Sequence, residues 1–223
     1  MNILDVLFGW ILGILSPLVV EKVKKRLQRE ELKDGLIIEL EEVQIKLISL
    51  TYLMNSDYGT FDRQFLQWIE PLVRKYKGIE ISRVTNISKH INSLLLLTDG
   101  LLSEHVEQSR RESPTGASVK KFYLPFLNSK LDSLSLFDCE FQRRILDINA
   151  QLLTLNGEIE RAQFYHAKTF DSSLGENNYN IVNKNLDMTY RNIGDMSRKL
   201  VDRIDIVISE KLTSHNTLKH HST

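Results

Sequence analysis

The sequence predicts an all-α protein, in which an N-terminal transmembrane helix is followed by an antiparallel helical bundle. Glycine and proline are scarce, at 10 and 4 of 223 residues, and this favours long helices over a turn-rich β fold. Several segments repeat apolar residues at steps of three and four, which is typical of helices packed along their length. No segment alternates apolar and polar residues for long enough to indicate a strand.

The first predicted element is a membrane anchor, residues 1–21. Its apolar run from Ile3 to Val20 contains one charge, Asp5, and as a helix it would extend about 27 Å, close to the roughly 30 Å of a bilayer core. Two alternatives are an apolar helix buried in a partner and a cleaved signal peptide; the second fits poorly, because no Lys or Arg precedes the run. The side chains expected to lie in lipid are Leu7, Phe8, Trp10, Ile11, Leu12, Ile14 and Leu15.

The next segment, residues 22–35, reads as a basic stalk. Positive charge stays on the cytoplasmic side of membranes, so we expect a single-pass protein of the cytoplasmic (inner) membrane, with its N-terminus outside and its body in the cytoplasm. The stalk cations are expected to contact anionic lipid. They are Lys22, Lys24, Lys25, Arg26 and Arg29.

Two glycines in the anchor predict self-association. Gly9 and Gly13 lie four residues apart, on one face of a helix, where they allow a second backbone to approach closely. We therefore expect a homodimer or higher oligomer formed in the membrane. The alternative is that glycine is simply common in membrane helices.

The bundle is predicted over residues 36–212, followed by a disordered tail at 213–223. Four long helices are expected, at about 31–55, 83–112, 138–171 and 177–212. Two short ones are expected between them, at about 60–77 and from Pro125. Thr60 or Asp62 is expected to cap the first short helix, and Asp138 the third long one. One of the stripes contains Ile145, Ile148, Leu152, Leu155, Ile159 and Ala162.

Motifs for chemistry are lacking in the sequence. There is no H-x-x-x-H, H-E-x-x-H or C-x-x-C spacing and no glycine-rich phosphate loop, so we predict neither a catalytic site nor a metal site nor a bound cofactor. Lys+Arg and Asp+Glu both number 29, which gives no electrostatic reason to expect nucleic acid as a partner. The single Cys139 excludes an intrachain disulfide. Glu39, Glu41 and Glu42 are interpreted as a solvated face.

Aromatic residues gather on the two predicted short helices. They are expected either to cap the ends of the bundle or to form a patch that binds a partner. The residues proposed for the patch are Phe61, Phe65, Trp68, Phe122 and Tyr123.

The function that fits this layout best is a non-enzymatic, membrane-anchored bundle that binds a partner or signal on the cytoplasmic side. The alternative is a membrane-perturbing effector, such as a toxin or defence component, that acts by assembling its transmembrane helices. The apolar stripes do not distinguish these two hypotheses, because both require a packed bundle.

Overall fold

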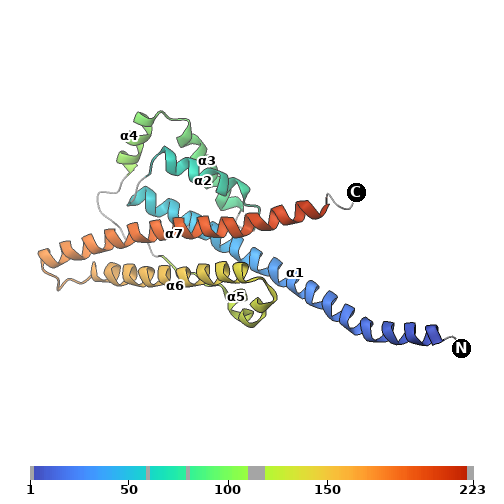
Figure 1. Ribbon diagram of the computed structural model, residues 1–223. Coiled ribbons are helices and arrows are strands. Elements are labelled where there is room, and N and C mark those ends of the chain that lie inside the picture. The colour runs from blue at the N-terminus through green and yellow to red at the C-terminus, as the bar shows by residue number, and fades with distance from the viewer. Residues whose placement is uncertain (1–2, 59–60, 79–80, 110–118, 220–223) are drawn as a thin grey trace.

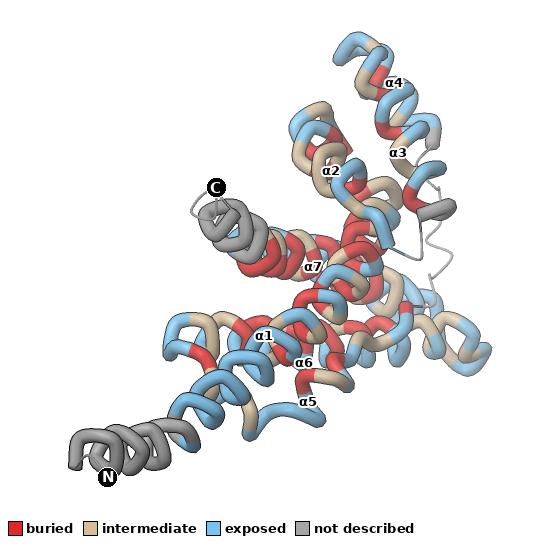
Figure 2. Tube along the Cα trace, turned by 90° about the vertical axis from the view of Figure 1, so that its right-hand side faces the viewer, coloured by how far each residue is buried: buried red, intermediate tan, exposed pale blue. Residues whose placement is uncertain are grey.

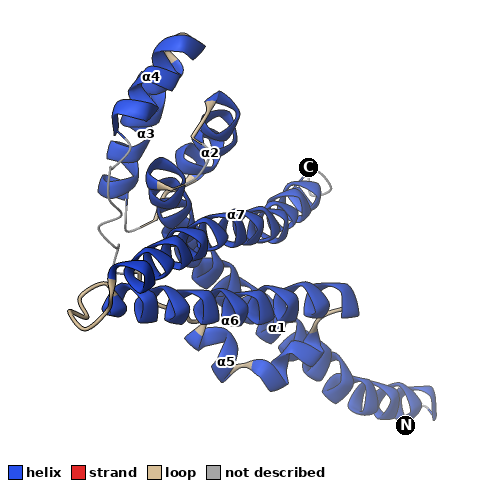
Figure 3. Cartoon of the chain, turned by 90° about the vertical axis from the view of Figure 1, so that its left-hand side faces the viewer, coloured by secondary structure: helices blue, strands red, loops and turns tan. Residues whose placement is uncertain are grey.

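A computed structural model describes the backbone of residues 3–58, 61–78, 81–109 and 119–219 (Figure 1). Within these ranges, side chains are described except at residues 3–16, 18, 81–83, 109 and 211–219. The elements in chain order are α1 (Ile3–Asp57), α2 (Arg63–Lys75), α3 (Ile81–Leu95), α4 (Asp99–Ser109), α5 (Pro125–Ser129), the 3-10 helix η1 (Leu131–Leu136), α6 (Cys139–Lys168) and α7 (Glu176–Lys219). Every described element is a helix, which confirms the predicted all-α class (Figure 3).

Three long helices form the central layer. Helix α7 lies between α1 and α6 and runs antiparallel to both. Gln44 of α1 donates to the carbonyl of Val201 at 3.4 Å, and Tyr58, directly after the end of α1, stacks on Tyr190 with ring centroids 4.6 Å apart. The heptad stripes supply the core: Leu36, Leu40, Leu47 and Met54 from α1, Ile145, Leu152, Leu155 and Ile159 from α6, and Leu186, Ile193, Leu200 and Ile204 from α7.

The prediction of one long helix at 83–112 is wrong. The chain turns at residues 96–98, and α3 and α4 are separate helices. Arg63 of α2 occupies this corner: its guanidinium donates to the carbonyls of Leu95 (2.9 Å) and Leu97, and its Nε lies 2.5 Å from the carboxylate of Asp99. The arginine thus satisfies carbonyls that the end of α3 leaves free. The fold therefore has three long helices with an α2–α3–α4 layer, and not a bundle of four.

The helix ends follow local rules. Asp62 accepts the backbone N–H of Phe65 at 2.7 Å and caps α2, and Asp138 accepts that of Phe141 at 2.9 Å and caps α6, as predicted. The hydrogen bond from the backbone N–H of Phe141 also holds the pKa of Asp138 below its usual value. Helix α7 continues to Lys219, into the segment predicted to be disordered.

Helix α1 is continuous through the predicted anchor and stalk, and the boundaries at 21 and 35 are not marked by any break. Residues 19–31 of α1 are all exposed and form the pale blue stretch of this helix (Figure 2). Among the residues whose side chains are described, no helix is long and apolar enough to cross a bilayer. The predicted anchor residues Leu7, Phe8, Trp10, Ile11, Leu12, Ile14 and Leu15, and the pair Gly9 and Gly13, lie outside the residues with described side chains.

Candidate functional site: a groove beside the first helix

An extended segment, residues 119–124, lies along α6 and forms one wall of the candidate site. Its backbone is held by side-chain amides. Asn156 accepts the N–H of Phe122 at 2.9 Å and donates to the carbonyl of Phe122 at 2.7 Å, and Gln163 donates to the carbonyl of Val119 at 2.8 Å. Val119 and Leu124 are buried, so the segment is fixed by apolar burial as well as by hydrogen bonds. We call residues 119–124 the strap.

Glu39 of α1 fixes the first turn of α5, which directly follows the strap. Its two carboxylate oxygens accept the backbone N–H groups of Phe126 (2.6 Å) and Leu127 (2.9 Å). Gly35, one turn earlier, leaves the space that the Phe126 ring occupies. The expectation of a solvated acidic face is therefore corrected for Glu39, which is half-buried and bonded, whereas Glu41 is exposed.

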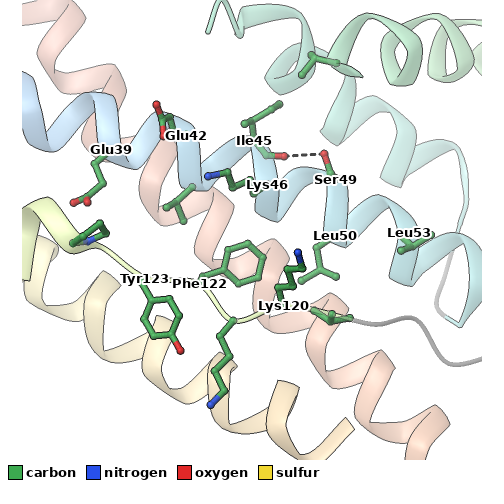
Figure 4. A pocket seen from close by; sticks show the side chains of 15 residues that line it. Glu39, Glu42, Ile45, Lys46, Ser49, Leu50, Leu53, Lys120, Phe122 and Tyr123 are labelled. Atoms are coloured by element: carbon green, nitrogen blue, oxygen red, sulfur yellow. Dashed lines mark hydrogen bonds between the residues drawn. The ribbon is translucent and has the colours of Figure 1, made fainter. Parts of the chain in front are cut away.

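Between α1 and the strap lies a groove of about 630 Å³ (Figure 4). Its floor is apolar, and Glu42, Lys46 and Lys120 lie at its edge. Within the described part of the chain, neither Lys46 nor Lys120 forms an ion pair, whereas the neighbouring Lys121 pairs with Glu160. The hydrogen bond to Glu160 raises the pKa of Lys121. The apolar side chains that line the groove are Val43, Ile45, Leu50, Leu53, Val84, Val119, Phe122 and Pro125.

The aromatic residues proposed for a partner patch do not form one exposed surface. Phe61 and Phe65 are buried in the core, which corrects that assignment for both. Trp68 is half-buried; its indole N–H donates to Asp202 at 2.7 Å, and the Arg198 guanidinium lies 4.7 Å from its ring centroid.

Phe122 and Tyr123 line the groove. Phe122 is half-buried, and Tyr123 is 62% exposed. The two predicted patch residues from the strap are therefore the ones that a ligand in the groove would meet.

The stalk cations are all exposed. Lys25 pairs with Glu21 at 2.7 Å and Arg26 with Glu30 at 3.1 Å, each within one helical turn. Arg29 reaches Asp138 at 3.7 Å and places its guanidinium over the Phe137 ring. Lys22 and Lys24 form no ion pair within the described residues, so both are available to an anion.

A second polar cluster was not expected from the sequence, which places its histidines far apart. The hydroxyl of Tyr52 lies 2.9 Å from Nδ1 of His90, and the His90 and His105 rings meet edge to face with centroids 6.4 Å apart. Burial raises the pKa of Tyr52 to about 12, so its hydroxyl keeps its proton. The described residues contain no group of three or more His, Cys, Asp or Glu placed to hold a metal ion.

Comparison with models of known protein families, with curated proteins and with solved structures gives no match. The interpretation of the groove therefore depends on its own residues.

Proposed function

We propose that the protein is a non-enzymatic, single-pass protein of the cytoplasmic membrane, and that its helical body binds a partner in the groove between α1 and the strap. The observation that supports this most directly is the continuity of α1. One unbroken helix runs from the apolar N-terminal run, through the basic stalk, to the wall of the groove. A partner in the groove would thus contact the same helix that enters the bilayer.

The chemistry of the groove defines the kind of partner. Its apolar floor accepts apolar side chains. At its edge the two ammonium groups of Lys46 and Lys120 outnumber the one carboxylate of Glu42, so the edge favours a carboxylate. Tyr123 adds an exposed aromatic face beside them. We therefore propose that the partner is a protein that presents an apolar segment next to an acidic side chain.

Membrane attachment is tested by fractionation of cells that express the full chain. We expect the protein to sediment with membranes and to resist extraction by high salt, because apolar burial and not charge holds it there. Reversing both free stalk cations, as Lys22→Glu with Lys24→Glu, should not release the protein, because each surface cation contributes only about 1 kcal/mol of attraction to anionic lipid and burial of the apolar run supplies most of the attachment. Full-length protein in the soluble fraction without detergent would refute the anchor.

Partner binding is tested by photo-cross-linking in cells. A photoreactive residue replaces Leu53 in the groove or, as a control, the exposed Leu131 in η1. We expect one adduct of defined mass from position 53 and none from position 131. The adduct should disappear when Lys46 and Lys120 are both replaced by Glu. An adduct that is indifferent to these charges would contradict the proposed chemistry of the groove.

Overexpression separates this proposal from the membrane-perturbing alternative. An interaction protein should leave growth and membrane potential unchanged. Growth arrest with loss of membrane potential would instead favour an effector that assembles its transmembrane helices.

A further inference from the structure

The stalk carries an apolar face that no described residue covers. Val20, Val23 and Leu27 are 62%, 52% and 60% exposed, and their spacing of three and four residues aligns them along one side of α1. The stripe that packs into the body begins at Leu32 and Leu36, on the opposite side of the helix. The stalk face therefore points away from the body.

We propose that this stalk face pairs with the same face of a second copy of the chain, as a short parallel two-stranded coiled coil. The parallel orientation rests on the proposed function, because two anchored copies enter the same bilayer from the same side. The first buried residues of the body stripe, Leu32 and Leu36, lie on the opposite side of α1, so the body does not cover the stalk face.

The apolar positions match a heptad seam. Val20 and Leu27 take the a position and Val23 takes the d position between them, so the three apolar side chains line one seam. In the sequence, the same spacing continues upstream through Ser16, Gly13 and Gly9. The predicted glycine face and the stalk face therefore belong to one register.

The charges beside this seam are complementary between two copies. Arg26 falls at a g position and Glu31 at the following e position, which are the positions that form ion pairs between parallel helices. Glu31 forms no ion pair within the described part of the chain. Within one chain Arg26 pairs with Glu30, and both side chains are more than half exposed. Replacing this ion pair by one between Arg26 and Glu31 of the second copy therefore costs little free energy.

The other stalk cations do not oppose each other in the pair. Lys22, Lys25 and Arg29 fall at the outer c and f positions, and Lys25 already pairs with Glu21 there. Lys24 flanks the seam beside Val19 of the second copy, so its aliphatic stem can cover that valine while its ammonium group reaches water. Positive charge in the stalk is thus compatible with pairing.

Three apolar positions bury little surface for a coiled coil in water. Confinement of both copies to one membrane favours their association in addition. Anchored copies share a thin layer and one orientation, which raises the effective concentration of one stalk for another. We therefore expect association in membranes.

Cysteine cross-linking of the full chain in membranes tests the pairing. The exposed Cys139 is first replaced by Ser, and single cysteines are then introduced as Val23→Cys on the stalk face or Lys25→Cys on the outer side. Mild oxidation should join most copies of the Val23→Cys variant and few of the Lys25→Cys variant. Equal cross-linking at positions 23 and 25 would overturn the proposal. Absence of cross-linking at position 23 would also overturn it, and would indicate that lipid covers the stalk face instead.

Charge exchange provides a second test. In the Val23→Cys background, Arg26→Glu should reduce the disulfide yield severalfold. On each side of the seam, the new carboxylate at position 26 would then face Glu31 of the second copy. Adding Glu31→Arg should restore the yield by reversing both pairs. Failure of the double variant to recover would overturn the assigned register.

Fractionation of each sample before oxidation separates the two proposals. Protein that sediments with membranes but does not cross-link would refute the stalk pair and leave the anchored function intact. Protein that cross-links at position 23 in the soluble fraction would refute the anchor and support pairing of the stalk.

Discussion

Residues 17–31 and residues 32–57 belong to the same helix, but their surroundings differ completely. In the first stretch every described side chain is exposed, whereas in the second a full face is buried against α7 and its neighbours. Both stretches carry apolar side chains at helical spacing, so spacing alone does not decide burial. The position of the other helices along α1 decides it, and the covered part begins near Gly35, where the Phe126 ring packs on α1.

The largest expected effect comes from a charge placed in the buried stretch of α1, compared with the same charge placed in the exposed stretch. Leu47 is fully buried and Leu27 is exposed. Leu47→Asp should cost several kcal/mol, on the order of a domain's whole stability, because it buries a carboxylate without a partner. Leu27→Asp should change the stability of the body by less than about 0.5 kcal/mol. Urea unfolding of the full chain in detergent, followed by circular dichroism, measures both, and a wild-type transition in Leu47→Asp would contradict the burial of this face.

Paired glutamate substitutions test the same contrast through hydrogen bonds. Glu39→Ala removes the acceptor for two backbone N–H groups in α5, directly after the strap, and should cost on the order of 2 kcal/mol. Glu21→Ala removes only an exposed pair with Lys25 and should leave the unfolding midpoint unchanged. Equal effects of the two changes would show that Glu39 does not fix the strap.

The smallest effects sharpen the boundary between the halves. A Cβ at position 35 would overlap the Phe126 ring, so Gly35→Ala should destabilise the protein by about 1 kcal/mol despite the better helix propensity of alanine. Gly157 in α6 has open space around it, and Gly157→Ala should stabilise the protein by about 0.5–1 kcal/mol. Melting temperatures report the sign of each change, and a stabilising Gly35→Ala would place the start of the packed half elsewhere.

The sequence by itself determined the features that depend on neighbours within about one helical turn. The stripe of α6, the caps at Asp62 and Asp138, and the all-helical class follow from spacing and capping, which are local properties. The same spacing rules aligned the stalk residues Val20 and Val23 on one face.

Only the tertiary structure decided the features that need a partner far along the chain. Arg63 meets the carbonyl of Leu95 at the corner between α3 and α4, Asn156 holds Phe122, and Glu39 holds Leu127. Each pair is separated by more than 30 residues in the sequence. No local pattern shows whether a guanidinium, amide or carboxylate on a helix is solvated or binds a distant backbone. The groove exists because these long-range hydrogen bonds hold the strap beside α1, so local sequence patterns could not reveal it.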